Sequence, residues 1–127
     1  MINTLNIGKY IHSVLDNSED ITCKVYPLIA DNNAKYPFII YKRVSMSSNA
    51  CKDGYYEDNV IMEITVVSDK YASSVDIATK IRNLLETQSV NYDDLEINDT
   101  TLSLATEEYS NNAYVQRLQF TMTINKN

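Results

Sequence analysis

Residues 54–86 constrain the fold more than any other stretch, because the spacing of their apolar residues changes once along the way. Residues 60–67 alternate with a period of two, which predicts a β-strand with one apolar face and one mixed face. The apolar face consists of Val60, Met62, Ile64 and Val66. From residue 75 onward the apolar residues recur every three or four positions, which predicts an amphipathic helix of roughly four turns. They are Val75, Ile77, Ala78, Ile81, Leu84 and Leu85. A strand that feeds a helix folding back onto the sheet is the expected nucleus of the domain.

Length and composition predict one domain spanning residues 1–127, with a hydrophobic fraction of 44% that suffices for a core. The formal net charge is −6, and no run of Lys and Arg is longer than Lys42-Arg43. This balance argues against a protein that grips nucleic acid with its whole surface, because phosphate binding needs clustered cations. The sequence has no secretory signal and no apolar stretch long enough for a membrane span, so a cytoplasmic, reduced protein is expected.

The residues that usually carry chemistry are few. Cys23 and Cys51 fit no zinc spacing, and His12 is the one histidine. Cys23 is expected to be a small buried hydrophobe, Cys51 to be exposed, and His12 to lie partly exposed without a partner at a suggestive spacing. The acids of residues 93–99 lack the central glycine of a calcium loop, so a solvated acidic face is expected. We therefore expect no catalytic, cofactor-binding or metal-ligating residues.

The remaining elements complete an α+β fold with a mainly antiparallel sheet, an N-terminal helix and a second helix packed on one face. The first expected helix spans residues 3–16 and is capped by Asn3 or Thr4. The second is the amphipathic helix that follows strand 60–67, and Ser73 or Ser74 caps it. The expected strands are 21–27, 38–44, 60–67, 101–107 and 114–124. Residues 87–100 read as an acidic connector with a short strand or turn at 90–97. At Tyr36-Pro37 an aromatic residue precedes proline, which favours the cis form of the peptide bond somewhat. Cis nevertheless remains the minority state in ordered proteins.

Turns and interfaces follow from two unusual counts, 2 glycines and 10 tyrosines. With so few glycines, Asn, Asp and Ser must form the turns, and Asn111-Asn112 is the expected tip of one. Tyrosine is enriched at protein interfaces, although most of these side chains can equally line sheet faces. Residues 45–54 are small and polar. They are either a protruding loop that inserts into a partner or an ordinary long hairpin loop. The polar row of the last strand, with Gln119 and Thr121, is either plain solvent surface or a surface covered in a ring.

The order of these pieces resembles the small tail-completion, or tail-terminator, proteins of long-tailed bacteriophages and prophages. The resemblance spans almost the whole chain, and scarce loop glycine is its main departure. It rests on the N-terminal helix, Val25-Tyr26-Pro27, the block from Tyr36-Pro37-Phe38 to Tyr41, the long loop, the segment from Tyr56-Glu57-Asp58 to Ser68, the helix Ser74 to Arg82, and Gln116-Arg117-Leu118-Gln119-Phe120.

The resemblance implies a structural virion protein with no enzyme residues. Such proteins assemble as a ring, commonly hexameric, that stops growth of the tail tube at its head-proximal end and faces the head connector. Implied partners are further copies of the chain, the tail tube protein and the head–tail connector protein, with no sequence-specific nucleic acid and no membrane. The implied location is the host cytoplasm during assembly and then the virion tail.

The sequence directs attention to two stretches for contacts, the loop at 45–54 and the acids at 93–99, together with exposed tyrosines. The candidate interface residues are Met46, Asn49, Lys52, Tyr55, Tyr56, Tyr71, Asp93, Asp94, Tyr109 and Arg117. Three rival interpretations remain: another neck or tail-tube component of related fold, a small binding domain with a deep apolar pocket between helix and sheet, and an enzyme. The enzyme would require His12, a cysteine and the acids of 93–99 to converge.

Overall fold

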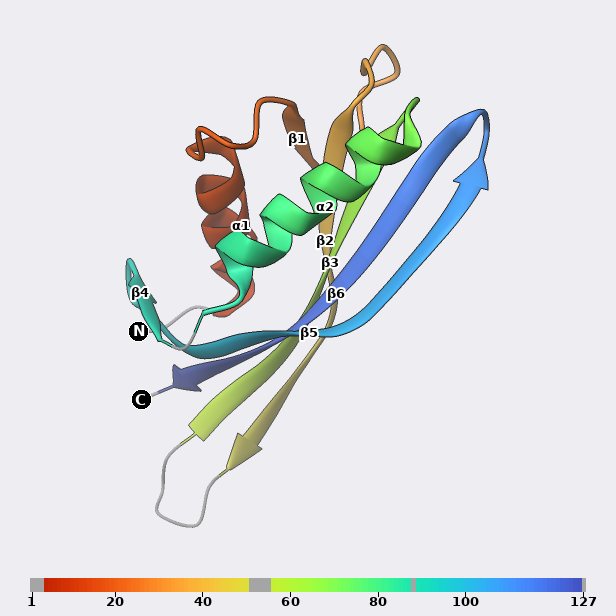
Figure 1. Ribbon diagram of the computed structural model, residues 1–127. Coiled ribbons are helices and arrows are strands. Elements are labelled where there is room, and N and C mark those ends of the chain that lie inside the picture. The colour runs from red at the N-terminus through yellow and green to blue at the C-terminus, as the bar shows by residue number, and fades with distance from the viewer. Residues whose placement is uncertain (1–3, 51–55, 88, 127) are drawn as a thin grey trace.

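The computed structural model describes residues 4–50, 56–87 and 89–126. Its elements in chain order are η1 (Thr4–Asn6), α1 (Ile7–Asp16), β1 (Lys24–Pro27), β2 (Phe38–Ala50), β3 (Tyr56–Ser68), α2 (Tyr71–Leu85), β4 (Val90–Tyr92), β5 (Leu95–Ser110) and β6 (Ala113–Lys126). Both helices lie on one side of a strongly twisted sheet, and two long hairpins extend past them at opposite ends (Figure 1).

The sheet has the strand order β1-β2-β3-β6-β5-β4. Strand β1 pairs with β2 in parallel, and every other pairing between neighbours is antiparallel. The α+β class with two helices on one face is therefore confirmed. The sheet is mixed, however, because residues 28–37 carry the chain from the end of β1 back to the start of β2. At Phe38–Tyr41, strand β2 is paired on both sides, with β1 and with β3.

The core lies between the helices and one face of the sheet. Helix α1 packs on β1 and β2, while α2 packs on β3, β6 and β5. The predicted apolar face of β3 is fully buried, from Val60 to Val66 in alternation. The fully buried side chains of largest volume are Phe120, Ile7, Ile11, Leu15, Ile39, Met62, Ile64, Ile81, Leu85, Ile97, Met122 and Ile124. Fully burying one such side chain contributes roughly 1.5–3 kcal/mol, so this single layer dominates the stability of the domain.

Two segments predicted as loop or connector are strand instead. Residues 45–50 continue β2 and pair with β3, for example Ser47 with Asn59 and Met46 with Val60. Strand β5 likewise begins at Leu95, inside the predicted acidic connector, and runs to Ser110, three residues past the predicted strand 101–107. Small polar residues have weak intrinsic strand preference, but the ladder to a strong neighbouring strand overrides it. The rest of the predicted loop, residues 51–54 with Cys51, lies outside the described residues.

The helix starts also differ from the prediction. Helix α2 begins at Tyr71, with Lys70 in the capping position and no side-chain cap. Ser74 is buried one turn inside the helix, where its hydroxyl donates to the carbonyl of Tyr71 at 2.7 Å. A 3₁₀ turn precedes α1, whose cap is Asn6 and likewise lacks a side-chain bond. The Tyr36-Pro37 bond is cis, against the trans majority.

Turns and bulges shape the long strands. Asn111 and Asn112 form the β5–β6 tip with φ of 54° and 65°, which confirms the expectation that asparagine replaces glycine there. The ladders shift register between Arg43 and Ser45 in β2, and at two places in β5 (Ile97 to Asp99 and Leu102 to Leu104). Bulges increase local twist and bend a strand, which fits the curl of this sheet.

Phe120→Ala tests the importance of the helix–sheet layer. Phe120 is fully buried between α2 and the sheet, so the substitution should lower the free energy of unfolding by about 3–5 kcal/mol. Thr121→Ala is the matched control, because it changes the next residue on the opposite, half-exposed face. Denaturant titration measures both, and equal losses would contradict this position of the core.

Candidate assembly surfaces

Strands β2 and β5 each leave part of one backbone edge unpaired within the described residues. Strand β1 covers β2 only at Phe38–Tyr41, so β2 is open from Lys42 onward. On the other side β4 covers β5 only at Leu95–Ile97. Beyond that, Thr87 accepts from the N–H of Thr100 at 3.0 Å, and Glu86 accepts from the N–H of Leu102 at 3.1 Å. The open edge of β5 therefore runs from 103 to 110, and such edges are templates for pairing with another chain.

Exposed large hydrophobic side chains collect at these same two edges. We define the β2-side surface as Leu5, Leu28, Ile29, Tyr36 and Val44, and the β5-side surface as Tyr71, Val75, Leu104 and Tyr109. Leu5 and Leu28 line a common hollow with Arg43 beside β2. Val75 lines a groove of about 470 Å³ between α2 and β5. These nine side chains are the exposed large hydrophobics among the described residues. Apolar groups gathered in this way mark interaction sites more often than scattered ones do.

Leu28 combines exposure with backbone strain. Its φ is 65°, in the left-handed region that costs a non-glycine residue roughly 1–2 kcal/mol. The conformation is held by its N–H, which donates to the carbonyl of Tyr41 at 2.8 Å, while the side chain remains 71% exposed. The fold thus holds a large apolar side chain outward in a conformation that asparagine or glycine would adopt more easily. Strain of this kind is a pointer to function.

Three tyrosines and two glutamates gather where β5 and β6 meet the start of α2. The Tyr114 ring lies 5.6 Å from that of Tyr71 and 4.9 Å from that of Tyr109. Glu107 accepts hydrogen bonds from the Tyr71 hydroxyl at 3.0 Å and from Nε2 of Gln116 at 2.9 Å. The bond to Glu107 and its negative charge raise the pKa of Tyr71, so this hydroxyl stays protonated and continues to donate.

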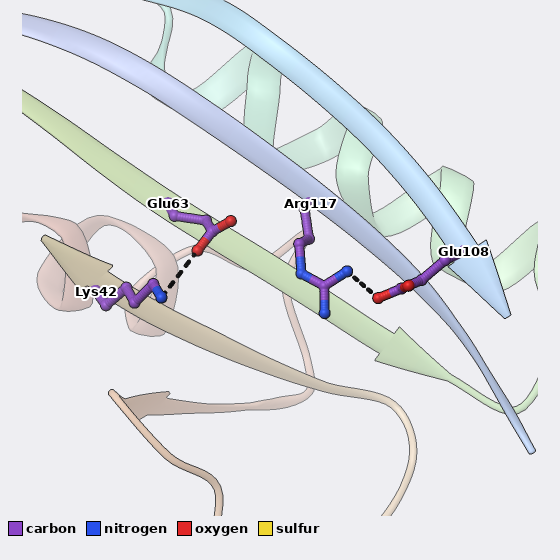
Figure 2. A network of polar contacts seen from close by, with 4 residues as sticks. All are labelled: Lys42, Glu63, Glu108 and Arg117. Carbon is purple, nitrogen blue, oxygen red and sulfur yellow. Dashed lines mark hydrogen bonds and ion pairs between the residues drawn. The ribbon is translucent and has the colours of Figure 1, made fainter. Parts of the chain in front are cut away.

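The sheet face away from the helices is mixed, with apolar residues such as Ile61 and Val67 beside paired charges. Nζ of Lys42 lies 3.4 Å from Glu63, and Arg117 bonds Glu108. Figure 2 shows both pairs on this face, in neighbouring strands. Exposed pairs of this type contribute about 0–1 kcal/mol each, so they tune the charge of the face more than they stabilise the fold.

The predicted interface residues fall into separate groups. Tyr71 and Tyr109 come together at the β5-side surface, and Arg117 lies on the opposite face of the same hairpin. Asp93 and Asp94 form the exposed β4–β5 turn, far along β5 from that cluster. Met46 is half-buried against the core. Asn49 and Tyr56 lie in the paired part of the β2–β3 hairpin. Lys52 and Tyr55 lie outside the described residues.

The residues of the enzyme interpretation line different hollows. His12 is half-exposed beside Tyr41, and its Nε2 lies 3.9 Å from a carboxylate oxygen of Asp16, a partner at i+4 that the sequence analysis overlooked. Cys23 lines another hollow with Lys24, and burial raises the pKa of its thiol, which disfavours the reactive thiolate. Among the described residues, no cluster of His, Cys, Asp or Glu could hold a metal, and no helix is long and apolar enough to cross a membrane.

Comparison with known proteins gives a likeness of fold. No protein-family model matches the sequence, and no curated protein matches it. One chain of the solved virion of a native gene transfer agent (GTA) particle superposes with a TM-score of 0.79. The match covers 91% of this chain and 92% of that chain, at 10% sequence identity. The chain shares its fold with that virion chain.

Several residues of the two surfaces escaped the sequence analysis. The apolar pair Leu28-Ile29 within a predicted loop was the available signal for the β2-side surface. The alternation of a regular strand would place Leu104 on the same face as Leu102, but the bulge between them turns it to the opposite face, against Gln119. Glu107 carries no local signal, since Tyr71 is 36 positions away and Gln116 lies opposite it only through the register of the β5–β6 hairpin.

Leu28→Asn tests whether the exposed Leu28 side chain contributes to the stability of its own fold. Because asparagine tolerates a positive φ and the leucine side chain is exposed, the free energy of unfolding should stay unchanged or rise by up to about 1 kcal/mol. Leu15→Asn, at a fully buried leucine of α1, is the control and should destabilise strongly. Denaturant titration decides, and a large loss in Leu28→Asn would mean that Leu28 packs within its own fold.

Glu86→Gln tests the link between the end of α2 and β5. The N–H of Leu102 and, second, the Arg82 side chain at 2.5 Å lower the pKa of Glu86 below its usual 4.5. A lowered pKa adds stability above pH 4.5 that disappears as pH falls through the folded-state value. The variant should therefore be less stable than wild type near neutral pH and approach it in acid. A difference that is independent of pH would contradict the assignment.

Proposed function

We propose that the protein is a structural component of a bacteriophage or prophage tail. In this proposal it forms a ring at the head-proximal end of the tail tube, stops tube growth and joins the tail to the head connector. The fold likeness to a GTA virion chain and the resemblance to tail-completion proteins support this role. The observation that carries it is the pair of different, opposite edge surfaces, because two unlike surfaces on one chain assemble head to tail.

The two surfaces complement each other in charge as well as in apolar area. One row of the sheet runs through Lys24, Phe38, Val67, Val115 and Glu108. This row has an exposed cation on β1 at one edge of the sheet and a carboxylate on β5 at the other. The open part of β2 adds Lys42 and Arg43, and that of β5 adds Glu107. When the sheet of one copy meets that of the next, opposite charges come together, which favours this pairing over like edges.

The strand directions suit the same arrangement. Three antiparallel pairings separate β2 from β5, so the two strands run in opposite directions. Rotation about a ring axis along the strands preserves these directions, and β5 of one copy therefore meets β2 of the next antiparallel. A bulge interrupts each open edge, so apolar and charged side chains must contribute beside any backbone pairing. A stable interface of this type buries about 800 Å² per partner.

The alternatives use the same surfaces differently. Another neck or tail-tube component of related fold would also assemble through its edges, but it would extend a tube or bind only the connector. A small binding domain would use the groove between α2 and β5 for a ligand. We propose no enzymatic role, no cofactor, no sequence-specific nucleic acid partner and no membrane partner.

Growth of the tail tube tests the proposal directly. The cognate tail tube protein is polymerised with and without this protein, and tube lengths and ends are examined by electron microscopy. We expect a ring on one end and an arrest of elongation there, even where the free protein is monomeric. Monomeric behaviour in light scattering together with no binding to the tube protein would overturn the proposal. Incorporation along the tube would support the tube-component alternative.

Leu104→Glu tests the β5-side surface within that assay. Leu104 is half-exposed in its own chain, so folding should be nearly unaffected. A charge buried in the interface should weaken ring formation about tenfold or more. Ser89→Glu, at an exposed position between α2 and β4, adds the same charge as a control and should form rings normally. Equal ring formation by both variants would place the interface elsewhere.

A further inference from the structure

The tip of the β5–β6 hairpin carries a built recess, which shares Tyr71 and Tyr109 with the β5-side surface and contains Glu107 of the open β5 edge. We call it the tyrosine–glutamate notch and define it by Tyr71, Glu107, Tyr109 and Tyr114. It is a hollow of about 260 Å³ between the hairpin and the first turn of α2, and Glu108 and Gln116 also line it. Side chains of a single chain form the recess, so it exists with or without ring assembly.

Three aromatic rings form the walls. Tyr114 stands between the other two, at an interplanar angle of 70° to Tyr71 and 59° to Tyr109. Tyr109 is 61% exposed and Tyr71 49%, so ring faces remain open to solvent. An open aromatic face attracts a cation placed over it, and several faces around one recess strengthen the attraction.

Glu107 places a carboxylate among these rings. Its two bonded neighbours, Tyr71 and Gln116, are neutral donors, so they orient the carboxylate without cancelling its charge. An ionised carboxylate has about four acceptor sites, which leaves capacity for further N–H donors. Gln116 is itself buried and reaches Ser74 of α2 at 3.3 Å, which fixes the position of Glu107 against the helix.

The nearest cation of the hairpin does not fill the notch. Arg117 bonds Glu108, and both lie on the opposite face of the two strands, as the close view shows (Figure 2). The recess is also smaller than the roughly 300–1,000 Å³ typical of small-molecule pockets, so a single side chain fits it better than a metabolite does.

We propose that the tyrosine–glutamate notch receives an arginine side chain presented by a partner protein. The flat guanidinium stacks on the rings while its N–H groups donate to Glu107. Lysine offers a compact ammonium with no plane to stack, so arginine suits this combination of walls and carboxylate better. The notch thus assigns a partner chemistry to one end of the molecule.

Tyrosine-ring NMR signals of the full-length protein, titrated with N-acetyl-arginine amide, test the assignment. The neutral isostere N-acetyl-citrulline amide and N-acetyl-lysine amide are run beside it. We expect shifts of the Tyr109 and Tyr114 ring signals with arginine, with a dissociation constant on the order of 1 mM for so small a probe. Citrulline should leave the signals unmoved, and lysine should bind more weakly.

Glu107→Gln should weaken arginine binding about tenfold, because it removes the charge that accepts the guanidinium. Glu96→Gln is the matched control, at an exposed glutamate near the start of the same strand and outside the notch, and should bind as wild type. Tyr109→Ala removes an exposed ring and should also bind arginine more weakly. It provides a second test of the notch in case Glu107→Gln fails to fold. Equal loss in both glutamate variants, equal shifts with citrulline, or lysine binding as tightly as arginine would overturn the proposal. None of these results depends on whether the ring forms.

Discussion

Burial of one sheet face beneath two helices is the interaction on which the rest of this structure depends. Ile81 and Leu85 of α2 are fully buried, as are Ile64 and Phe120 on the neighbouring strands β3 and β6. This layer leaves the other face mixed in polarity and half-exposed. Because the strands of 13 to 16 residues are longer than the area that the helices cover, their ends extend as hairpins (Figure 1).

The open edges arise because the outermost strands are short. The short strands β1 and β4 cover only part of β2 and β5, so each side of the sheet exposes backbone. Soluble proteins usually blunt such edges with bulges and charges, and both are present here. The same edges nevertheless expose large apolar side chains and hold Leu28 outward in a strained conformation. This combination is the basis of the proposal that the chain assembles with other copies.

Periodicity predicted much of the fold, and its failures have identifiable causes. The strand of 60–67 and the last strand were predicted with the correct buried faces, because these elements carry strong apolar repeats. The helix that follows was predicted as well, but its buried face was wrong at the start, where Val75 is exposed and Ser74 is buried. The second half of β2 and the ends of β5 were missed, since their small polar residues become strand only through pairing with β3 and β6. A one-residue bulge was enough to put Leu104 on the wrong face. Of the candidate interface residues, Tyr71 and Tyr109 proved to be neighbours, but nothing in the sequence joined them to Glu107 and Tyr114.

The sequence by itself determined the class of the fold, the faces that form the core, and the scarcity of residues suited to catalysis. These properties depend on local spacing and composition, which any stretch of chain displays on its own. The tertiary structure alone decided which strand edges stay open, where the exposed apolar side chains gather, and which side chains meet in the tyrosine–glutamate notch. Those properties depend on strand order and register, which bring together residues that are 36 and 43 positions apart, as Tyr71 is from Glu107 and Tyr114.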